Sequence, residues 1–259
     1  MAGATHRALR DDEDTASLEL RREILDALAV KVGPTVLAGQ QVLPVSLACR
    51  ELFPEGGLRR GSTVAVSSPA LAFAVLAQAS GAGSWICCVE RVEASTLGWV
   101  SAAEYGVALD RVVVARVPAG GGASAAGSSA VGGGSAAVVS AALDAFDVVL
   151  VSGVVLAPRD ARRLQHRARE RNAVLMVVER AGLLDGLAVG ADVRLEFSSQ
   201  QWEGVEQGHG ALERRLVKVS VQGRRAAGRS RDVAIWLPAT TGVAAVVDSS
   251  APVRSLVAR

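Results

Sequence analysis

The sequence predicts an α/β fold in which a mostly parallel β-sheet is covered by helices on both faces. Between residues 43 and 238, short apolar runs alternate with stretches of helical periodicity. Uninterrupted apolar runs are typical of parallel strands, because such strands are buried on both faces. Half of the residues are hydrophobic but only 3% are aromatic, so the core is expected to consist mainly of Ala, Val and Leu.

The N-terminal region is expected to lie outside the sheet. Residues 1–14 contain an acidic run, which argues against a signal peptide and predicts a disordered start. Ser17–Val32 has the periodicity of an amphipathic helix, so 15–42 is expected to form a helix and a linker. The apolar stripe of this helix has no place in the predicted core and is a candidate partner interface. It consists of Leu20, Ile24 and Leu28.

The predicted core domain, residues 43–238, begins with a short helical stretch and continues with alternating strands and helices. Pro69 starts one of these helices, at a position where proline is favoured. The last three strands are expected to form an antiparallel edge of the sheet. In chain order, the predicted elements are the helical stretch Leu43–Phe53, strand Thr63–Val66, helix Pro69–Ala79, strand Trp85–Val89, helix Thr96–Tyr105, strand Arg111–Val117, helix Ala136–Ala145, strand Val148–Val151, helix Pro158–Arg171, and strands Ala173–Val178, Val193–Phe197, Glu213–Val221 and Asp232–Leu237.

Two segments lack a regular period. Residues 118–135 are nearly all Gly, Ala and Ser, which predicts a flexible surface loop. A phosphate cradle is the alternative, but this segment has no Lys and does not directly join a strand to a helix. Residues 239–259 are expected to form a flexible C-terminal tail.

A glycine-rich turn, a strand and a second turn together have the setting of a phosphate-binding loop. In such a loop, G-x-x-x-x-G-K-[ST], backbone N–H groups surround the phosphates, the Lys supplies the counter-charge and the Ser/Thr holds magnesium. Here the turn that opens the helix contains neither Gly nor Lys. It consists of Ser67, Ser68, Pro69 and Ala70. The sequence therefore predicts no catalytic residue, no nucleotide or other cofactor, and no metal at this position.

Several segments, taken in order, resemble RecA over about residues 43–237. They are the lead Gly56-Gly57-Leu58-Arg59-Arg60-Gly61, the segment Glu104–Val114, the Walker-B-like strand Phe146–Val151 and the late strand Ala191–Glu196. The resemblance implies a RecA-like sheet with a degenerate phosphate loop.

The chain is more similar to the RecA-like ImuA group, in particular to its actinobacterial form. The segment Leu52–Gly61, the hairpin sequence Trp202–Gly210 and the strand Ile235–Pro238 carry this similarity. It implies a non-catalytic accessory factor of SOS mutagenesis that assembles a translesion-synthesis complex. The implied partners are an ImuB-like Y-family polymerase relative and an error-prone DnaE-type polymerase. An N-terminal helix of RecA packs on the neighbouring subunit, so self-association is a further expectation.

The departures from RecA decide between this function and its alternatives. Ser152 stands where the Walker B acid would follow its strand, and Glu93 lies near the position of the catalytic Glu. Without phosphates or magnesium, Glu93 is expected to be a surface or capping carboxylate. A divergent RecA-like ATPase is the rival function, and the missing Lys and Walker B acid argue against it.

A DNA-binding RecA paralogue is the other alternative, and it depends on clustered arginines. Arg162, Arg163 and Arg167 lie on the basic helix, and Arg224 and Arg225 lie in a predicted hairpin tip. These residues are candidate DNA contacts, or they form a solvated surface without a ligand. No aromatic residue alternates with the arginines of the helix to stack on bases.

The remaining candidate residues favour structural roles. His209 is expected to be a turn histidine, because no second ligand has a metal-binding spacing. Trp202 is expected to anchor the hairpin, with a partner-facing role as the alternative. Cys87 and Cys88 are expected to be inert core thiols.

Two sequence features bear on where in the cell the protein lies: its cysteine usage and the polar residues that interrupt its apolar segments. An odd number of cysteines and no disulfide framework favour a reducing, cytoplasmic compartment, with nucleoid association implied by the resemblance. Residues 61–89 carry no formal charge, but Ser, Gly, Pro and Gln interrupt them at strand–turn–helix intervals. A membrane span is therefore not expected.

Overall fold

A computed structural model of the chain describes most of the predicted core. The described residues are 42–92, 97–118, 133–179, 188, 190–206, 209–223, 230–239 and 243–247. The predictions for 1–14, for the Ser17–Val32 helix and for Glu93 lie outside these residues. So do 119–132 of the predicted flexible loop and most of the predicted tail.

Among the described residues, nine strands form one mixed sheet in the order β11-β10-β9-β8-β3-β7-β6-β4-β5. The six strands from β8 to β5 are mutually parallel, and β8, β9, β10 and β11 pair antiparallel. The predicted α/β fold is confirmed at this level. The strands are β3 (Thr63–Val66), β4 (Ile86–Arg91), β5 (Val112–Val117), β6 (Val148–Ser152), β7 (Val174–Val178), β8 (Val193–Glu206), β9 (His209–Gly223), β10 (Arg231–Trp236) and β11 (Ala245–Val246).

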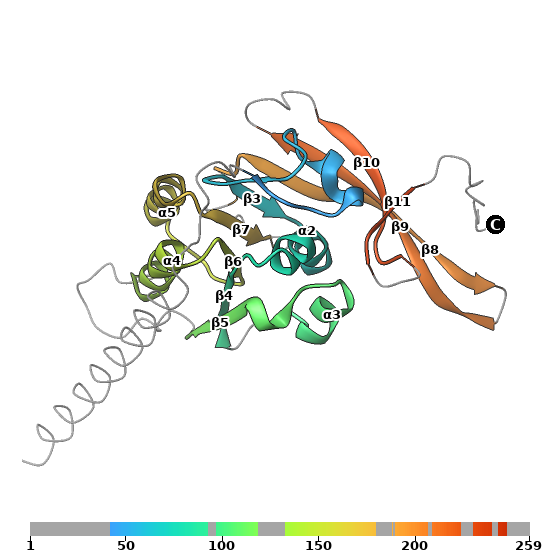
Figure 1. Cartoon of the computed structure of the whole chain (residues 1–259), viewed down its shortest axis with the longest axis horizontal. Helices are drawn as coiled ribbons and strands as arrows, with labels where there is room; N and C mark the ends of the chain where they lie inside the picture. The colour runs from blue at the N-terminus through green and yellow to red at the C-terminus, as the bar shows by residue number, and fades with distance from the viewer. Residues whose placement is uncertain are drawn as a thin grey trace, which may run out of the picture.

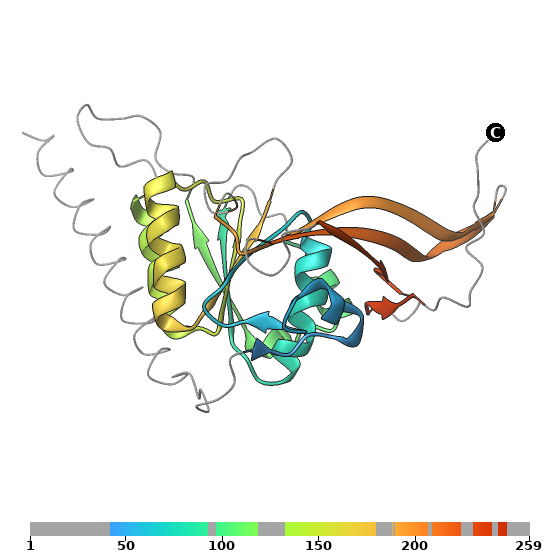
Figure 2. The same cartoon turned by 90° about the horizontal axis from the view of Figure 1, so that it is seen from above.

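Helices cover both faces of the sheet (Figure 2). Strands β3, β4, β6 and β7 are buried along almost their whole length, so each contributes apolar side chains to both faces in alternation. On one face lie α2 (Pro69–Gly81), α3 (Trp99–Glu104) and the 3-10 helix η1 (Leu47–Leu52). On the other face lie α4 (Gly133–Ala145) and α5 (Pro158–Arg171).

Several boundaries differ from the predictions. The stretch expected to be helical from Leu43 begins as a short strand, β1 (Val42–Leu43), which pairs with β2 (Leu58–Arg59) before η1 starts. A 3-10 turn, η3 (Leu109–Arg111), precedes β5. Helix α4 starts at Gly133, three residues before the predicted start and inside the predicted loop, although Gly133 and Gly134 have low helix propensity. Within the predicted tail, β11 adds to the sheet edge by pairing with β10.

The β8–β9 hairpin is much longer than predicted and projects from the body of the molecule (Figure 1). Strand β3 pairs with β8 only from Val193 to Leu195, and β10 pairs with β9 only from Leu216 to Val221. Beyond these pairings the hairpin is a two-stranded ribbon. Gly204 has a φ of 102° at a bulge in β8, and an added Cβ there would meet the carbonyl oxygen of Ala211 at 2.2 Å.

Packing explains why the segment before β3 is rich in glycine. An added Cβ at Gly57 would meet the carbonyl oxygen of Leu43 at 2.5 Å, so only glycine lets β1 and β2 approach. Gly61 has a φ of 74° and lies against the backbone of Arg169, where α5 ends. Both glycines therefore serve packing at the amino ends of the parallel strands.

A buried ion pair joins this lead to the centre of the sheet. Arg60 Nη2 donates to Asp147 Oδ1 at 2.8 Å, and the two side chains are only 10% and 12% exposed. The other carboxylate oxygen of Asp147 accepts the backbone N–H of Trp85 at 2.9 Å. Asp147 thus connects the segments that enter β3, β4 and β6.

Asp147→Ala is expected to destabilise the fold by about 3–5 kcal/mol, because it leaves Arg60 buried without its counter-charge. Urea unfolding followed by circular dichroism measures the change. Glu55→Ala is the matched control, since Glu55 and Arg59 form an exposed ion pair at 3.9 Å on the same side of the sheet. A loss for Asp147→Ala no larger than that for Glu55→Ala would contradict the role assigned to Asp147.

Candidate functional site

The connection from β3 to α2 is the position where a phosphate loop would lie. Strand β3 ends at Val66 and α2 begins at Pro69, so only Ser67 and Ser68 join them. A phosphate loop needs about eight positions to wrap backbone N–H groups around an anion. The two-residue connection cannot form such a cradle.

Ser67 uses both its N–H and its hydroxyl in hydrogen bonds to β8. Its N–H donates to the carbonyl oxygen of Leu195 at 3.0 Å, and its hydroxyl accepts the N–H of Phe197 at 3.1 Å. The side chain therefore extends the pairing between β3 and β8 by one step. Ser68 occupies the N-cap of α2 without a side-chain capping bond, and Pro69 has no N–H to offer.

A groove of about 700 Å³ opens beside this connection, at the carboxyl end of β3. We call it the carboxyl-edge groove. In open α/β sheets, ligands generally bind at this edge. The start of α2, the α3 segment, the hairpin and the end of β10 all contribute to it. Its lining includes Ser68, Pro69, Ala70, Phe73, Ser101, Glu104, Tyr105, Trp202, Glu213, Arg215 and Pro238.

Arg215 holds the hairpin wall of the groove in place. Its Nε donates to the carbonyl oxygen of Leu237 at 2.7 Å, and Nη1 donates to Gln200 at 3.3 Å. The guanidinium also lies over the rings of Phe197 and Trp202, at 5.4 and 5.1 Å from their centroids. Arg215 is thus bound within the protein on several sides.

Two carboxylates give the groove an acidic character. Glu104 on α3 and Glu213 on β9 are both exposed, and neither forms an ion pair with another residue in the described part of the chain. The only cation that lines the groove, among the described residues, is Arg215. This charge arrangement repels a triphosphate, although the start of a helix would by itself favour an anion.

The Walker-B-like strand ends in a buried, polar pair of positions. Ser152 at the end of β6 is 1% exposed and stands in register with Glu90 of β4, which is 0% exposed. Glu90 accepts a hydrogen bond from Arg116 Nε of β5 at 3.2 Å. Glu90 was not among the residues predicted from the sequence to be functional. The sequence feature that could have identified it is a carboxylate that directly follows the apolar run Ile86–Val89 of a buried strand.

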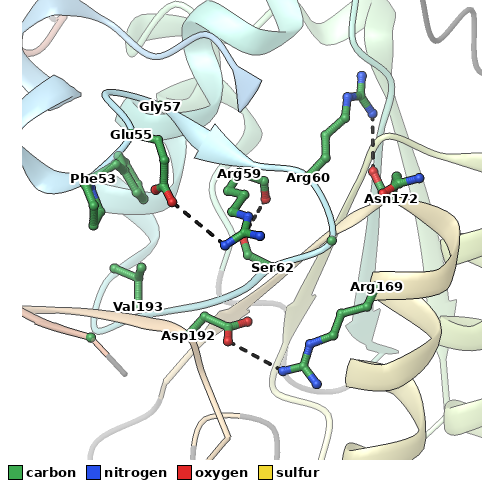
Figure 3. A pocket seen from close by; sticks show the side chains of 13 residues that line it. Phe53, Glu55, Gly57, Arg59, Arg60, Ser62, Arg169, Asn172, Asp192 and Val193 are labelled. Atoms are coloured by element: carbon green, nitrogen blue, oxygen red, sulfur yellow. Dashed lines mark hydrogen bonds and ion pairs between the residues drawn. The ribbon is translucent and has the colours of Figure 1, made fainter. Parts of the chain in front are cut away.

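A second pocket lies at the opposite, amino-terminal edge of the parallel strands and measures about 280 Å³ (Figure 3). Its arginines suggest an anion site, but each has an acidic partner among the described residues. Arg59 pairs with Glu55 at 3.9 Å and Arg169 with Asp192 at 3.5 Å. Arg60 pairs with Asp147. The charges of this pocket are therefore already balanced.

The structure separates the candidate DNA contacts of α5 into two kinds. Arg162 and Arg163 are exposed, and neither pairs with an acidic residue in the described segments. Arg167 instead forms a bidentate ion pair with Asp144 of α4, and Arg171 shares that carboxylate at 2.9 Å. Arg224 and Arg225, like the stripe Leu20, Ile24 and Leu28, lie outside the described residues.

The remaining candidates are spread over the fold. His209 is exposed at the start of β9, and Trp202 is 38% exposed in the carboxyl-edge groove. No group of three or more His, Cys, Asp or Glu in the described segments could hold a metal ion. In the same segments, no helix is both long and apolar enough to cross a membrane.

Comparison with known proteins places the chain in a family. Residues 51–182 match the family described as the MT3502 N-terminal domain, which is half of the chain. The chain belongs to this family. No curated protein matches the chain. The match spans β3 to β7 and ends before the β8–β9 hairpin, so Trp202, Glu213 and Arg215 of the groove lie beyond the shared region.

The buried cysteines yield a prediction with a defined pH window. Burial raises the pKa of Cys87 to about 12. It also raises that of Cys88, and the neighbouring Glu90 and Cys87 act in the same direction. The pKa of Cys49 is raised by burial as well. The folded state therefore favours the neutral thiol, and this contribution is complete below about pH 8.5, the unfolded value.

At pH 8, no thiol of the folded protein is expected to react rapidly with Ellman's reagent. In the urea-unfolded chain, all three thiols are expected to react. As the pH rises above about 8.5 toward 12, the stabilising contribution is lost and the free energy of unfolding should fall. A fast-reacting thiol in the folded protein at pH 8 would show that one cysteine is accessible and activated.

Proposed function

We propose that this protein is a RecA-like, non-catalytic accessory factor of DNA-damage-induced mutagenesis. In this role it assembles an error-prone translesion-synthesis complex with an ImuB-like Y-family polymerase relative and a DnaE-type polymerase, through protein contacts in the cytoplasm. The observation that carries the proposal is the connection between β3 and α2, where two serines replace a phosphate loop.

The arrangement of the sheet supports the RecA-like part of the proposal. The six parallel strands continue into an antiparallel C-terminal edge, as the resemblance implies. The strand that leads into Ser67 and the strand that ends at Ser152 are separated only by β7. Both serines therefore lie at the same edge, where the two Walker motifs of a nucleotide-binding relative would meet.

The chemistry of that edge supports the non-catalytic part. Ser67 is used to bind the backbone of β8, and the Walker B position is a buried serine. The adjacent groove offers two carboxylates and an arginine that is already bound within the protein. A nucleotide-dependent enzyme would need the opposite charge here. This arrangement disfavours a divergent ATPase.

Mg-ATP is expected to leave the melting temperature unchanged. A ligand at 100 times its dissociation constant would stabilise the fold by about 2.7 kcal/mol. For a chain of this size, that would raise the melting temperature by roughly 5–10 °C. Thermal unfolding with millimolar Mg-ATP, compared with magnesium and sodium chloride at equal ionic strength, gives the test. A reproducible shift of that size would overturn the non-catalytic function.

Ile24→Asp together with Leu28→Asp is expected to abolish assembly while the core stays folded, because the two substitutions place charge on the candidate interface stripe. Size-exclusion chromatography of the chain mixed with the ImuB-like protein measures assembly. Arg22→Asp is the matched control, since it makes the same net change of charge on the opposite side of the predicted helix.

Three outcomes of the assembly experiment are distinguishable. Loss of the complex with unchanged melting supports an interface on the stripe. Loss of the complex together with unfolding assigns the helix to the core. Failure of the unmodified chain to bind the ImuB-like protein would overturn the proposed function.

A further inference from the structure

We infer that the carboxyl-edge groove is a docking site for an extended segment of a partner protein that presents an arginine or lysine beside an apolar residue. The inference depends on the proposed function only in taking the occupant to be a protein. The groove lies beside the β3–α2 connection, where a phosphate loop would lie, but its charges fit a cation.

The charges of the groove are complementary to a cationic side chain. Glu104 and Glu213 come from different elements and line the same hollow, and neither has an ionic partner within the described residues. An arginine or lysine between them would form charge-assisted hydrogen bonds. Arg215 does not fill this role, because it already binds Leu237 and Gln200.

The surface beside these carboxylates is apolar and aromatic. Pro69 and Pro238 are partly exposed and line the groove. Phe73 and Tyr105 also contribute to its lining but are buried, at 2% and 8% exposed, with ring centroids 6.4 Å apart. Trp202 leaves part of its ring exposed here. Arg215 lies over that ring from within the protein. A cation on the partner can contact its remaining surface, with an apolar neighbour packed on the prolines.

The hairpin favours an extended occupant. Strand β8 lies beside β3 only as far as Leu195, with one further contact from Phe197 to Ser67. Past this point, no described strand pairs with that edge of β8, which runs on into the projecting ribbon (Figure 1). A free strand edge of this kind pairs readily with an extended segment of another chain.

A phage-displayed library of random decapeptides, panned against the immobilised full-length chain, tests the inference. Enriched peptides are expected to carry Arg or Lys next to a large apolar residue, and their binding should weaken as salt is raised. In Glu104→Gln with Glu213→Gln, their affinity should fall at least about tenfold. Both residues are exposed, so this variant is expected to fold.

The matched control is Asp160→Asn with Glu170→Gln, which removes two carboxylates that line a different groove, between α4 and α5. This variant should bind the enriched peptides as the unmodified chain does. The absence of enrichment, enrichment of neutral or acidic peptides, or equal binding by both variants would overturn the inference. The chain could also self-associate, and this association could disappear only in the Glu104→Gln, Glu213→Gln variant. That result would identify a second copy of this chain as the occupant and would overturn the inference.

Failure of the inference can be told apart from failure of the proposed function. If the variant that lacks Glu104 and Glu213 still assembles with the ImuB-like protein, and no peptide is enriched, the proposed function stands without this groove. If basic peptides bind the groove but the ImuB-like protein does not bind the chain, the groove stands and the partner is different.

Discussion

The central strands of the sheet are buried on both faces, and this constraint governs where chemistry can occur. Strands β3, β6 and β7 bury every residue, so ionisable groups are excluded from their length unless they are paired. The cysteines of β4 stay neutral for the same reason. Charged residues that could meet a partner are therefore found at the two ends of the strands, on the outer helices and on the ribbon.

The two ends of the parallel strands differ in how their charges are used. At the amino end, Arg60, Arg59 and Arg169 are each neutralised by a nearby carboxylate. Of these pairs, the shielded Arg60–Asp147 pair holds the segments that enter the strands. In the carboxyl-edge groove the situation is reversed, although Arg116 pairs with Glu90 elsewhere at that end of the strands. Arg215 is bound by neutral groups and aromatic rings, and Glu104 and Glu213 remain available. Charges at the amino end are thus used within the fold, whereas the groove keeps two carboxylates without an ionic partner in the described part of the chain.

The sequence predicted elements well where one local signal was sufficient. Strand β3 and helix α5 have the predicted bounds, because Thr63–Val66 is an isolated apolar run and Pro158–Arg171 has a proline start and an amphipathic period. A hairpin at Trp202–Gly210 was expected, but the length of its strands was not. The distal half of β8 is polar and bulged, so its strand character comes from pairing with β9. The groove was not predictable, since Pro69, Glu104 and Arg215 meet only through the tertiary fold.

The length of the β3–α2 connection is a stronger constraint on function than the identity of its residues. A lysine substituted at Ser68 would add a charge but no backbone N–H groups around a phosphate. Nucleotide binding would require an inserted loop, and that loop would have to displace the contacts of Ser67 with Leu195 and Phe197. These contacts fix the position at which β8 leaves the body of the sheet. The same short connection that leaves no room for a phosphate cradle therefore sets the position of the hairpin, which forms one side of the groove.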